Sequence, residues 1–190
     1  MKYLDLTFTT PAENLACDEA LLDWCEERGD DEILRVWEPG QHFVVLGYAN
    51  KAGLEVNLSA CQELAIPVLR RCSGGGTVLQ GPGCLNYSLL LRINGPKPVG
   101  TIAEANAYIM GVHQKALASI LDAPVTIEGH TDLAIRGMKF SGNAQRRRKR
   151  FLLFHGTFLI NLEFGKIDQA LRMPSKRPTY RHTRPPAQFL

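Results

Sequence analysis

The sequence predicts an α+β fold in which a mixed central β-sheet packs against helices. Three observations predict it. Two segments open with a threonine-based capping box and continue as helices, one at residues 10–29 and one from residue 101. Several short apolar runs bounded by Gly, Pro, Asn or Asp have the length of strands. The chain also has 190 residues and no internal repeat, which suits a single domain over 1–190 with a large core.

The composition is that of an ordinary globular protein. It has 45% hydrophobic and 22% charged residues and a net charge of +3, which does not by itself indicate nucleic-acid binding. No run approaches the eighteen or so apolar residues of a membrane span, and MKYLDLTFTT lacks the features of a secretory signal. The five cysteines form no CxxC pair, so neither a disulfide framework nor a zinc site is indicated. We expect a reduced, cytoplasmic protein with no membrane partner.

The first helix begins at Thr10-Pro11-Ala12-Glu13, where a threonine cap precedes a proline and a glutamate completes the capping box. It is expected to end at Gly29, a favourable residue just after a helix. The run at 42–48 lacks alternation and suits a strand buried on both faces. The other elements expected in this half are a strand at 32–39, a short helix around 60–64 and a strand at 66–71.

The second half begins with a strand at 84–93, which places Leu85, Tyr87, Leu89 and Leu91 on one side. After a loop at 94–100, a capping box at Thr101–Glu104 starts the second helix. The apolar stripe expected to face the core consists of Ala105, Ile109, Val112, Ala116 and Ile120. Further strands are expected at 124–129, 132–145 and 151–164, followed by an extended, Pro- and Arg-rich tail at about 172–190.

The segment RRCSGGGTVLQGPG, residues 70–83, needs a functional explanation. Gly74, Gly75 and Gly76 lose more backbone entropy on folding than other residues, roughly 0.5–1 kcal/mol each relative to alanine. Neither GxxxxGK[ST] nor GxGxxG is present. A turn of glycines can still direct several N–H groups at an anion, with Arg70 or Arg71 as a clamp. The alternative is a tight turn between strands, flanked by surface arginines.

Two further clusters place a polar side chain among small residues. In GHTDLAIRGMKFSGNAQ, Lys139 lies between Gly137 and Ser141-Gly142. The alternative for this lysine is a solvated charge at a strand end. In FHGTFLINL, His155-Gly156-Thr157 interrupts an apolar strand, and a single histidine there is alternatively a satisfied core residue.

Together these segments resemble the lipoate–protein ligase A family, part of a broader group that includes biotin ligases and octanoyltransferases. The resemblance extends over nearly the whole chain and is specific only as a joint pattern. It comprises NLACDEALL, VVLGYAN, RRCSGGGTV, LNYS, TDL…KFSGNAQRR and HGTFL.

The resemblance implies a catalytic domain of the class II aminoacyl-tRNA synthetase and biotin ligase type. It implies an enzyme that uses ATP and Mg²⁺ to activate lipoate or octanoate as an acyl-adenylate, releasing pyrophosphate. The acyl group then passes to a lysine of a lipoyl carrier domain, either a 2-oxoacid dehydrogenase E2 subunit or the glycine cleavage H protein. No nucleic acid takes part.

The resemblance also assigns roles to residues. Lys139 would hold the reacting carboxyl group and stabilise its developing negative charge. Asp132 would orient the nucleotide or bind its Mg²⁺, and His155 and Thr157 would complete the carboxyl end of the pocket. The full set implied for binding is Arg70, Arg71, Ser73, Gly74, Gly75, Gly76, Thr77, Val78, Leu79, Asn86, Asp132, Ser141, Gly142, His155, Gly156 and Thr157.

The chemistry explains why such groups are needed. Burial of an eight-carbon tail contributes on the order of 5 kcal/mol, at roughly 0.8 kcal/mol per methylene. That energy holds the tail but does not activate the carboxylate. Joining a carboxylate to a phosphate brings two anions together, and one fixed ammonium and a row of N–H groups meet that need.

The sequence departs from the family pattern in three respects. Gln80 stands where many relatives have histidine, and Thr131 where many have asparagine. Many bacterial ligases also carry a smaller accessory domain after the catalytic one, and no such segment is present here. Either a separate accessory protein supplies it, the chain is part of a longer one, or the enzyme only transfers a ready-made acyl group.

The rival interpretation is an octanoyltransferase, which moves octanoyl from acyl carrier protein through a cysteine acyl-enzyme without ATP. The segment upstream of Lys139, PVTIEGHTDLAIRG, contains no cysteine. Cys72 and Cys84 flank the glycines, and a cysteine near Arg70 and Arg71 could have a lowered pKa. The alternative for both cysteines is small buried filler.

The basic run RRRKR, residues 146–150, has three interpretations. It is a solvated hairpin tip, a surface that steers an acidic carrier domain, or a nucleic-acid patch. A non-catalytic acyl-binding protein is a further alternative, against which Lys139 argues. Biotin is disfavoured as a substrate, because RRCSGGG departs from the GRGRxGR loop of biotin ligases.

Overall fold

The computed structural model describes residues 1–29, 31–173 and 179–190. Its larger sheet has seven strands in the order β1-β2-β6-β10-β9-β8-β7. β1 runs parallel to β2, and the other neighbouring pairs are antiparallel. The strands are β1 (Lys2–Asp5), β2 (Ile33–Trp37), β6 (Cys84–Arg92), β7 (Val125–Glu128), β8 (Asp132–Ile135), β9 (Met138–Arg147) and β10 (Phe151–Leu159). The predicted α+β class with a mixed sheet is confirmed.

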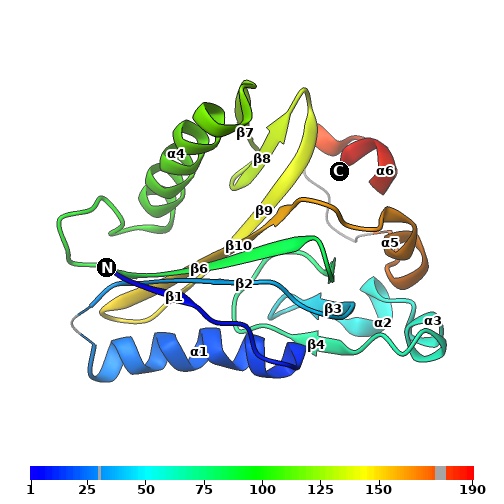
Figure 1. The fold of residues 1–190 in the computed structure, drawn as a ribbon, viewed down its shortest axis with the longest axis horizontal. Helices are drawn as coiled ribbons and strands as arrows, with labels where there is room; N and C mark the ends of the chain where they lie inside the picture. Colours follow the sequence, from blue (N-terminus) through cyan, green and yellow to red (C-terminus); the bar gives the residue numbers. More distant parts are fainter. Residues whose placement is uncertain (30, 174–178) are drawn as a thin grey trace.

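A smaller sheet lies beside the larger one, with the strand order β4-β3-β5. It consists of β3 (Phe43–Leu46), β4 (Val68–Arg70) and β5 (Val78–Gln80). β3 is buried along its whole length, as its lack of alternation predicts. Three short helices cover this sheet: α2 (Ala52–Glu55), α3 (Leu58–Glu63) and α5 (Phe164–Ala170) (Figure 1). The sequence patterns do not indicate β1, β5, α2 or α5.

Alternation along β10 explains how the larger sheet holds two helices. Phe151 and Leu153 pack with Leu22 and Cys25 of α1 (Pro11–Glu27). Leu152 and Phe154 project to the opposite face and pack with residues of α4 (Ile102–Leu121). α1 and α4 therefore lie on opposite sides of the sheet (Figure 1).

Both predicted capping boxes are present, at Thr10–Glu13 and Thr101–Glu104. The predicted helix end is confirmed, because α1 ends at Glu27 with Arg28 as its C-cap and Gly29 follows directly. Gly29 is not among the residues with positive φ. Its Cβ would instead stand 2.6 Å from the Cα of Cys25, so the close return of the chain onto α1 requires glycine here.

Only two of the five residues that are predicted to face the core from the second helix are buried. Ala105 and Ile109 are buried, whereas Val112 and Ile120 are 50% and 74% exposed and Ala116 is exposed as well. The buried side of α4 includes Met110 and continues through the partly buried Leu117. The helix therefore packs on the sheet with a face rotated away from the predicted stripe.

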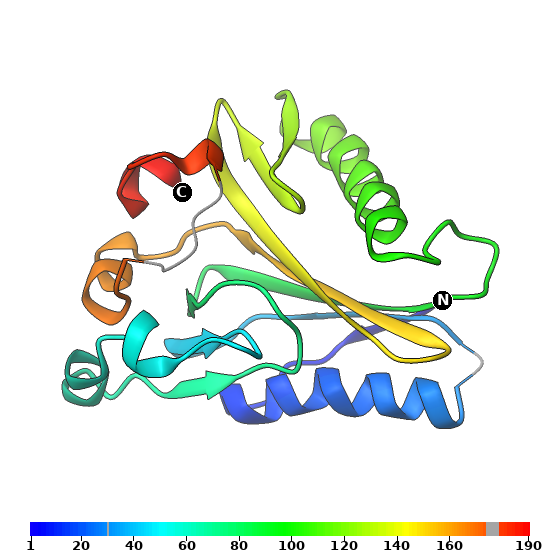
Figure 2. The same ribbon diagram turned by 180° about the vertical axis from the view of Figure 1, so that it is seen from behind.

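Two predicted extended segments are also wrong in part. The run at 132–145 is broken by Arg136 and Gly137, whose φ angles of 53° and 77° reverse the chain between β8 and β9. In the expected tail, residues 174–178 lie outside the described residues. Residues 179–190 form the 3₁₀-helix η1 (Thr179–Arg181) and the short helix α6 (Pro186–Phe189), beside β9 and α5 (Figure 2).

The basic run at 146–150 spans the end of β9 and the β9–β10 turn, and the turn is held by α1. Arg148 forms an ion pair with Asp23 at 2.7 Å. The Glu26 carboxylate accepts hydrogen bonds from the backbone N–H groups of Lys149, Arg150 and Phe151. These contacts give the run a structural role at a hairpin turn.

A buried ion pair anchors α1 to the larger sheet. Arg35 of β2 has a fully buried side chain, and its Nη1 lies 2.6 Å from Asp18 Oδ1. The guanidinium also donates to the backbone oxygens of Leu6 and Asn14 and to Asn14 Oδ1. These contacts use four of the five guanidinium N–H donors, and three of them are to Asn14 and Asp18 of α1, so the cation is satisfied only while α1 stays in place.

In the described part of the chain, no helix has both the length and the apolar composition needed to cross a membrane.

Two Asp–Arg pairs of α1 give a matched test of this anchor. Asp18→Asn removes the charge partner of a buried cation and is expected to lower the free energy of unfolding by about 3–5 kcal/mol. Asp23→Asn removes an exposed partner, since the Asp23 and Arg148 side chains are 46% and 36% exposed, and should cost under about 1 kcal/mol. Urea unfolding measures both. Equal losses in the two variants would contradict the assignment of Asp18 as the anchor.

Candidate active site

One face of the larger sheet carries a row of five residues from five strands. By the strand registers, Asp132 lies beside Gly142, and Gly142 beside Thr157. Thr157 in turn lies beside Asn86, and Asn86 beside Trp37. Residues paired across a sheet project to the same side. All five line a cavity of about 930 Å³, of which this row forms one wall.

Lys139 reaches this face because of a β-bulge. The β8–β9 register shifts between Leu133 and Ala134, which leaves Phe140 as an extra residue. Three residues apart on a regular strand, Lys139 and Gly142 would project to opposite sides, and the extra residue brings them to the same side. Lys139 Nζ lies 2.8 Å from Asp132 Oδ1. A Cβ at Gly142 would stand 2.8 Å from Nζ, so glycine here leaves room for the ammonium.

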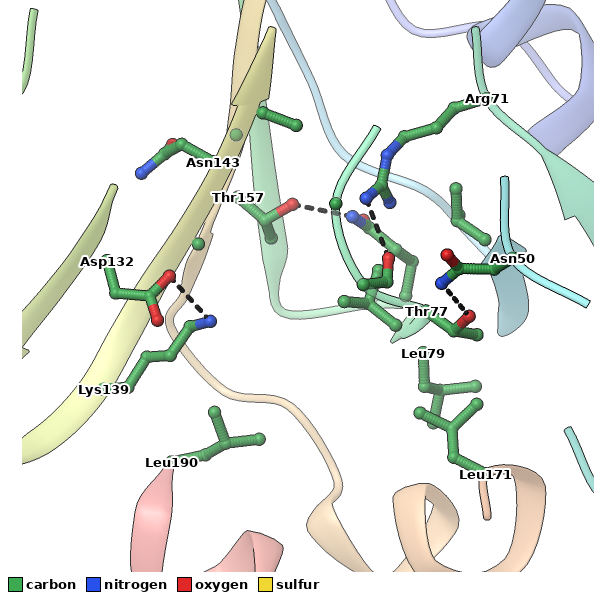
Figure 3. A pocket seen from close by; sticks show the side chains of 18 of the residues that line it. Asn50, Arg71, Thr77, Leu79, Asp132, Lys139, Asn143, Thr157, Leu171 and Leu190 are labelled. Atoms are coloured by element: carbon green, nitrogen blue, oxygen red, sulfur yellow. Dashed lines mark hydrogen bonds and ion pairs between the residues drawn. The ribbon is translucent and has the colours of Figure 1, made fainter. Parts of the chain in front are cut away.

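The glycine loop, residues 71–77, connects β4 to β5 and forms the facing wall, with Arg71 and Thr77 across from Lys139 (Figure 3). A Cβ added at Gly74 or Gly76 would meet nothing within 4 Å. Gly75 has φ 91°, and its Cβ would stand 2.8 Å from Arg71 Nη2. Backbone conformation therefore requires Gly75, whereas Gly74 and Gly76 leave open space beside the main chain.

The arginines before the glycines hold the loop. Arg70 Nη1 donates to the backbone oxygens of Gly47, Tyr48 and Asn50. Arg71 donates to the backbone oxygens of Gly74 and Gly76, and burial lowers its pKa to about 10, so it remains a cation at neutral pH. Arg71 lines the cavity and Arg70 does not. The expected anion clamp thus falls to Arg71 alone.

Most predicted site residues meet at this cavity. Those that line it are Arg71, Gly75, Gly76, Thr77, Val78, Leu79, Asn86, Asp132, Lys139, Gly142, His155, Gly156 and Thr157. Arg70, Ser73, Gly74 and Ser141 are not among the lining residues. Ser73 and Ser141 are fully buried, so they act on the cavity only through their neighbours.

Sequence analysis misses several lining residues. Leu15, Trp37 and Val45 bring apolar surface from α1 and the two sheets. Other missed lining residues are Asp18, Asn50, Lys51, Gln80, Tyr87, Asn143, Arg181, Phe189 and Leu190. Several belong to segments that carry the family resemblance, such as NLACDEALL, LNYS and KFSGNAQ. That signal could have identified them, whereas nothing in the tail sequence indicates a wall of the cavity.

A chain of polar contacts joins the glycine loop to α1. Ser73 Oγ accepts from Arg71 Nε and is hydrogen-bonded to His155 Nε2 at 2.6 Å. On the other side of the ring, His155 Nδ1 faces Asp18 Oδ2 at 3.5 Å. The buried Asp18–Arg35 pair thus fixes the orientation of His155, which in turn holds the start of the loop.

A second network lies where the cavity meets the α4 side. Asn143 Oδ1 accepts from the hydroxyl of Tyr87 at 2.7 Å, and Asn143 Nδ2 donates to the Thr131 backbone oxygen. A Cβ at Gly156 would coincide with Asn143 Oδ1, so this glycine makes space for the amide. His113 packs edge-on against Tyr87, and burial lowers its pKa to about 4.

The five cysteines all fall within the described residues, and none lines the cavity. Cys84 is fully buried. Burial raises the pKa of both Cys72 and Cys84 to about 11, so their thiolates are scarce at neutral pH. This agrees with the interpretation that both cysteines only pack against neighbouring residues and take no part in catalysis.

The described residues do not fit a protein-held metal ion. They contain no group of three or more His, Cys, Asp or Glu side chains arranged to hold one. Asp132, the predicted Mg²⁺ ligand, already uses both carboxylate oxygens, one for Lys139 and one for the hydroxyl of Tyr180.

Comparisons with known proteins agree with this geometry. A family model described as the lipoyl protein ligase A/B catalytic domain matches residues 10–187. Octanoyltransferase LipM of Carboxydothermus hydrogenoformans is 31% identical over an alignment of 193 residues. The alignment covers 92% of this chain and 70% of LipM. A putative lipoate-protein ligase A of Aeropyrum pernix is 33% identical over 164 residues, which cover 86% of this chain and 59% of that protein.

Solved structures share the fold. A lipoate-protein ligase A bound with ATP superposes with a TM-score of 0.82 at 24% identity, covering 100% of this chain and 77% of the other. A bi-partite lipoate protein ligase from Thermoplasma acidophilum, described with its E2 lipoyl domain, gives 0.74 at 25% identity, covering 92% and 67%.

The glycine loop offers a test of which glycine the backbone requires. Gly75→Ala places a side chain at φ 91° beside Arg71 and is expected to lower the free energy of unfolding by about 1–2 kcal/mol. Gly74→Ala, in open space, should change it by under about 1 kcal/mol. Chemical denaturation of both variants decides this. A larger loss for Gly74→Ala would contradict the described loop conformation.

His113 gives the protein a pH-dependent stability term. Because the fold lowers the pKa of His113 from 6.5 to about 4, the unfolded chain binds the extra proton first as pH falls. The stabilisation is complete above pH 6.5 and is lost as pH falls toward 4. Between pH 7 and pH 4, wild type should lose about 2–3 kcal/mol more unfolding free energy than His113→Gln. If the unfolding free energies of wild type and His113→Gln fell in parallel between pH 7 and pH 4, the lowered pKa of His113 would be contradicted.

Proposed function

The chain belongs to the lipoyl protein ligase A/B catalytic-domain family, and on that premise we propose that it is an ATP-dependent lipoate–protein ligase. It is an enzyme of the lipoate ligase and octanoyltransferase group. The reaction joins lipoate to ATP as lipoyl-adenylate and then passes the lipoyl group to a lysine of a lipoyl carrier domain.

One observation carries this proposal: the Lys139 ammonium and an open glycine backbone line the same cavity, which no cysteine lines. The ammonium at Lys139 and the N–H groups near Gly76 are the donors that an acyl phosphate needs. A covalent acyl-enzyme would instead need a reactive thiol at the cavity.

The apolar part of the cavity suits the lipoyl tail. Leu15, Trp37 and Val45 line it together with Leu79 of β5. Burial of the tail holds the carboxylate head near the glycine loop and contributes on the order of 5 kcal/mol. Binding energy from this unreactive tail then positions the reacting group.

In the first step, a lipoate carboxylate oxygen attacks the α-phosphorus of ATP, and pyrophosphate leaves with the electrons of the broken P–O bond. Lys139 offsets the negative charge that builds up as the two anions approach. Arg71, held across the cavity by the loop carbonyls, adds a second positive charge. Mg²⁺ would arrive with ATP, and we derive no step from a protein-held ion.

In the second step, the neutral amine of the carrier lysine attacks the acyl carbon, the C–O bond to the phosphate breaks, AMP leaves with its electrons, and the amine nitrogen loses a proton to solvent. Donors around the acyl carbonyl stabilise the oxyanion of the tetrahedral intermediate. The acceptor that we propose is a lipoyl domain of an E2 subunit or the glycine cleavage H protein. The Thermoplasma ligase described with its E2 lipoyl domain supports this class of partner.

The second candidate is an ATP-independent octanoyltransferase. The LipM relative favours it, at 31% identity over most of the chain. The thiols of Cys72 and Cys84 weigh against it, because octanoyltransferases of this fold use a cysteine nucleophile, whereas these two cysteines lie outside the cavity and have raised pKa values. ATP-dependent ligation therefore ranks first.

The proposal is tested by ATP–pyrophosphate exchange with lipoate and with octanoate, each with and without a candidate accessory protein. Lipoate should support exchange. Lys139→Met should lower the rate by about 100-fold or more, because the variant loses a cation from the reacting site. Cys72→Ser and Cys84→Ser, matched controls outside the cavity, should stay within about twofold of wild type.

The rival makes the opposite prediction. Octanoyl transfer from acyl carrier protein without ATP, abolished by either serine variant, would reverse the ranking of the two functions.

A further inference from the structure

Segment 179–190 forms a wall of the cavity beside Lys139. Arg181, Phe189 and Leu190 of this segment are among the lining residues. Figure 3 shows Leu190 below Lys139. Sequence analysis assigns no function to this segment, and the proposed mechanism does not use it.

The hydroxyl of Tyr180 reaches the carboxylate that pairs with Lys139. Tyr180 Oη lies 2.5 Å from Asp132 Oδ2, while Asp132 Oδ1 lies 2.8 Å from Lys139 Nζ. An ionised carboxylate only accepts hydrogen bonds, so the phenol is the donor. The two oxygens of Asp132 are thus divided between the phenol and the ammonium.

Tyr180 is itself held on three sides. Its backbone oxygen accepts from Arg184 Nη2 at 2.8 Å, and Arg184 Nη1 donates to the Gly137 backbone oxygen in the β8–β9 turn. Its ring lies 5.3 Å from the ring of Phe189. The chain at Gly129 packs beside the ring, since a Cβ there would lie at an ordinary van der Waals distance of 3.5 Å from it.

Phe189 links the phenol to the ammonium. Phe189 is only 4% exposed, and Lys139 Nζ lies 5.9 Å from the centroid of its ring. An ammonium over an aromatic face is attracted to it without losing its charge. Burial and the neighbouring Asp132 carboxylate raise the pKa of Tyr180, so its hydroxyl stays protonated as a donor.

We infer that Tyr180 is a positioning residue for the reaction: it holds one oxygen of Asp132, so that the other oxygen fixes the place of the Lys139 ammonium. This inference rests on the proposed function of Lys139. Because the phenol occupies Oδ2, Asp132 engages Lys139 through one oxygen. The ammonium keeps two of its three donors for an acyl carboxylate or phosphate.

The test uses Tyr180→Phe, which keeps the ring packing and removes only the hydroxyl. In ATP–pyrophosphate exchange with lipoate, kcat should fall about tenfold or more, because a hydrogen bond to a charged group is lost. The KM for lipoate should change by less than about threefold, since the tail contacts are unaltered. Tyr108→Phe, on α4 and outside the cavity lining, is the matched control and should resemble wild type.

A double-variant cycle with Asp132→Asn separates positioning from general structure. If Tyr180 acts through Asp132, the variant that carries both changes is no slower than Asp132→Asn alone. The inference would be overturned if the rate losses of the two single variants multiplied in the double variant, or if Tyr180→Phe had wild-type kinetics.

A second readout decides the inference even if lipoate supports no exchange and the proposed function fails. Competitive acetylation with acetic anhydride, read by mass spectrometry, compares Lys139 with the exposed Lys115 as internal reference. Loss of the Tyr180 hydroxyl should lower the relative labelling of Lys139 severalfold, because the released Asp132 carboxylate can then engage the ammonium through both oxygens. An unchanged ratio in Tyr180→Phe would overturn the inference.

Discussion

The proposed site depends on one constraint: the Lys139 ammonium must face an anionic substrate without being neutralised by the carboxylate of its own neighbour. Lys139 meets Asp132 at 2.8 Å through one carboxylate oxygen, while the other oxygen is held by Tyr180. The side chain of Lys139 is 20% exposed, so solvent screens the pair only partly. A freely rotating carboxylate could engage the ammonium through both oxygens and lower its attraction for a substrate anion.

The fold supplies this arrangement by combining regular and irregular parts. The row from Asp132 to Trp37 follows directly from strand pairing and gives the cavity a rigid wall. The bulge at Phe140 brings Lys139 onto that wall, and the positive φ of Gly75 shapes the facing loop. The regular strands therefore hold the cavity wall in a fixed geometry. The bulge and the glycine loop place the Lys139 ammonium and the loop N–H groups at the cavity. Since the Ser73–His155–Asp18 contacts join the loop to α1, the loop and the apolar slot form one connected unit.

The sequence predicts the parts that depend on local chemistry. Both capping boxes, the fully buried strand at 43–46 and the three-glycine segment are visible because each residue type has a direct backbone consequence. The site residues come from the family resemblance, which names segments but not the side to which a side chain projects. The bulge at Phe140 has no compositional signal, so the side to which Lys139 projects cannot be derived from alternation. Segment 179–190 and the rotated face of α4 depend on tertiary packing, which no local pattern contains.

The most direct test of the central claim is a crystal structure of the protein with lipoyl-adenylate bound. We expect Lys139 Nζ within about 3 Å of an acyl or phosphate oxygen, with Asp132 still bonded to the Tyr180 hydroxyl and the phosphate beside Gly76. An ammonium that points into solvent, with the acyl phosphate bound away from the glycine loop, would contradict it.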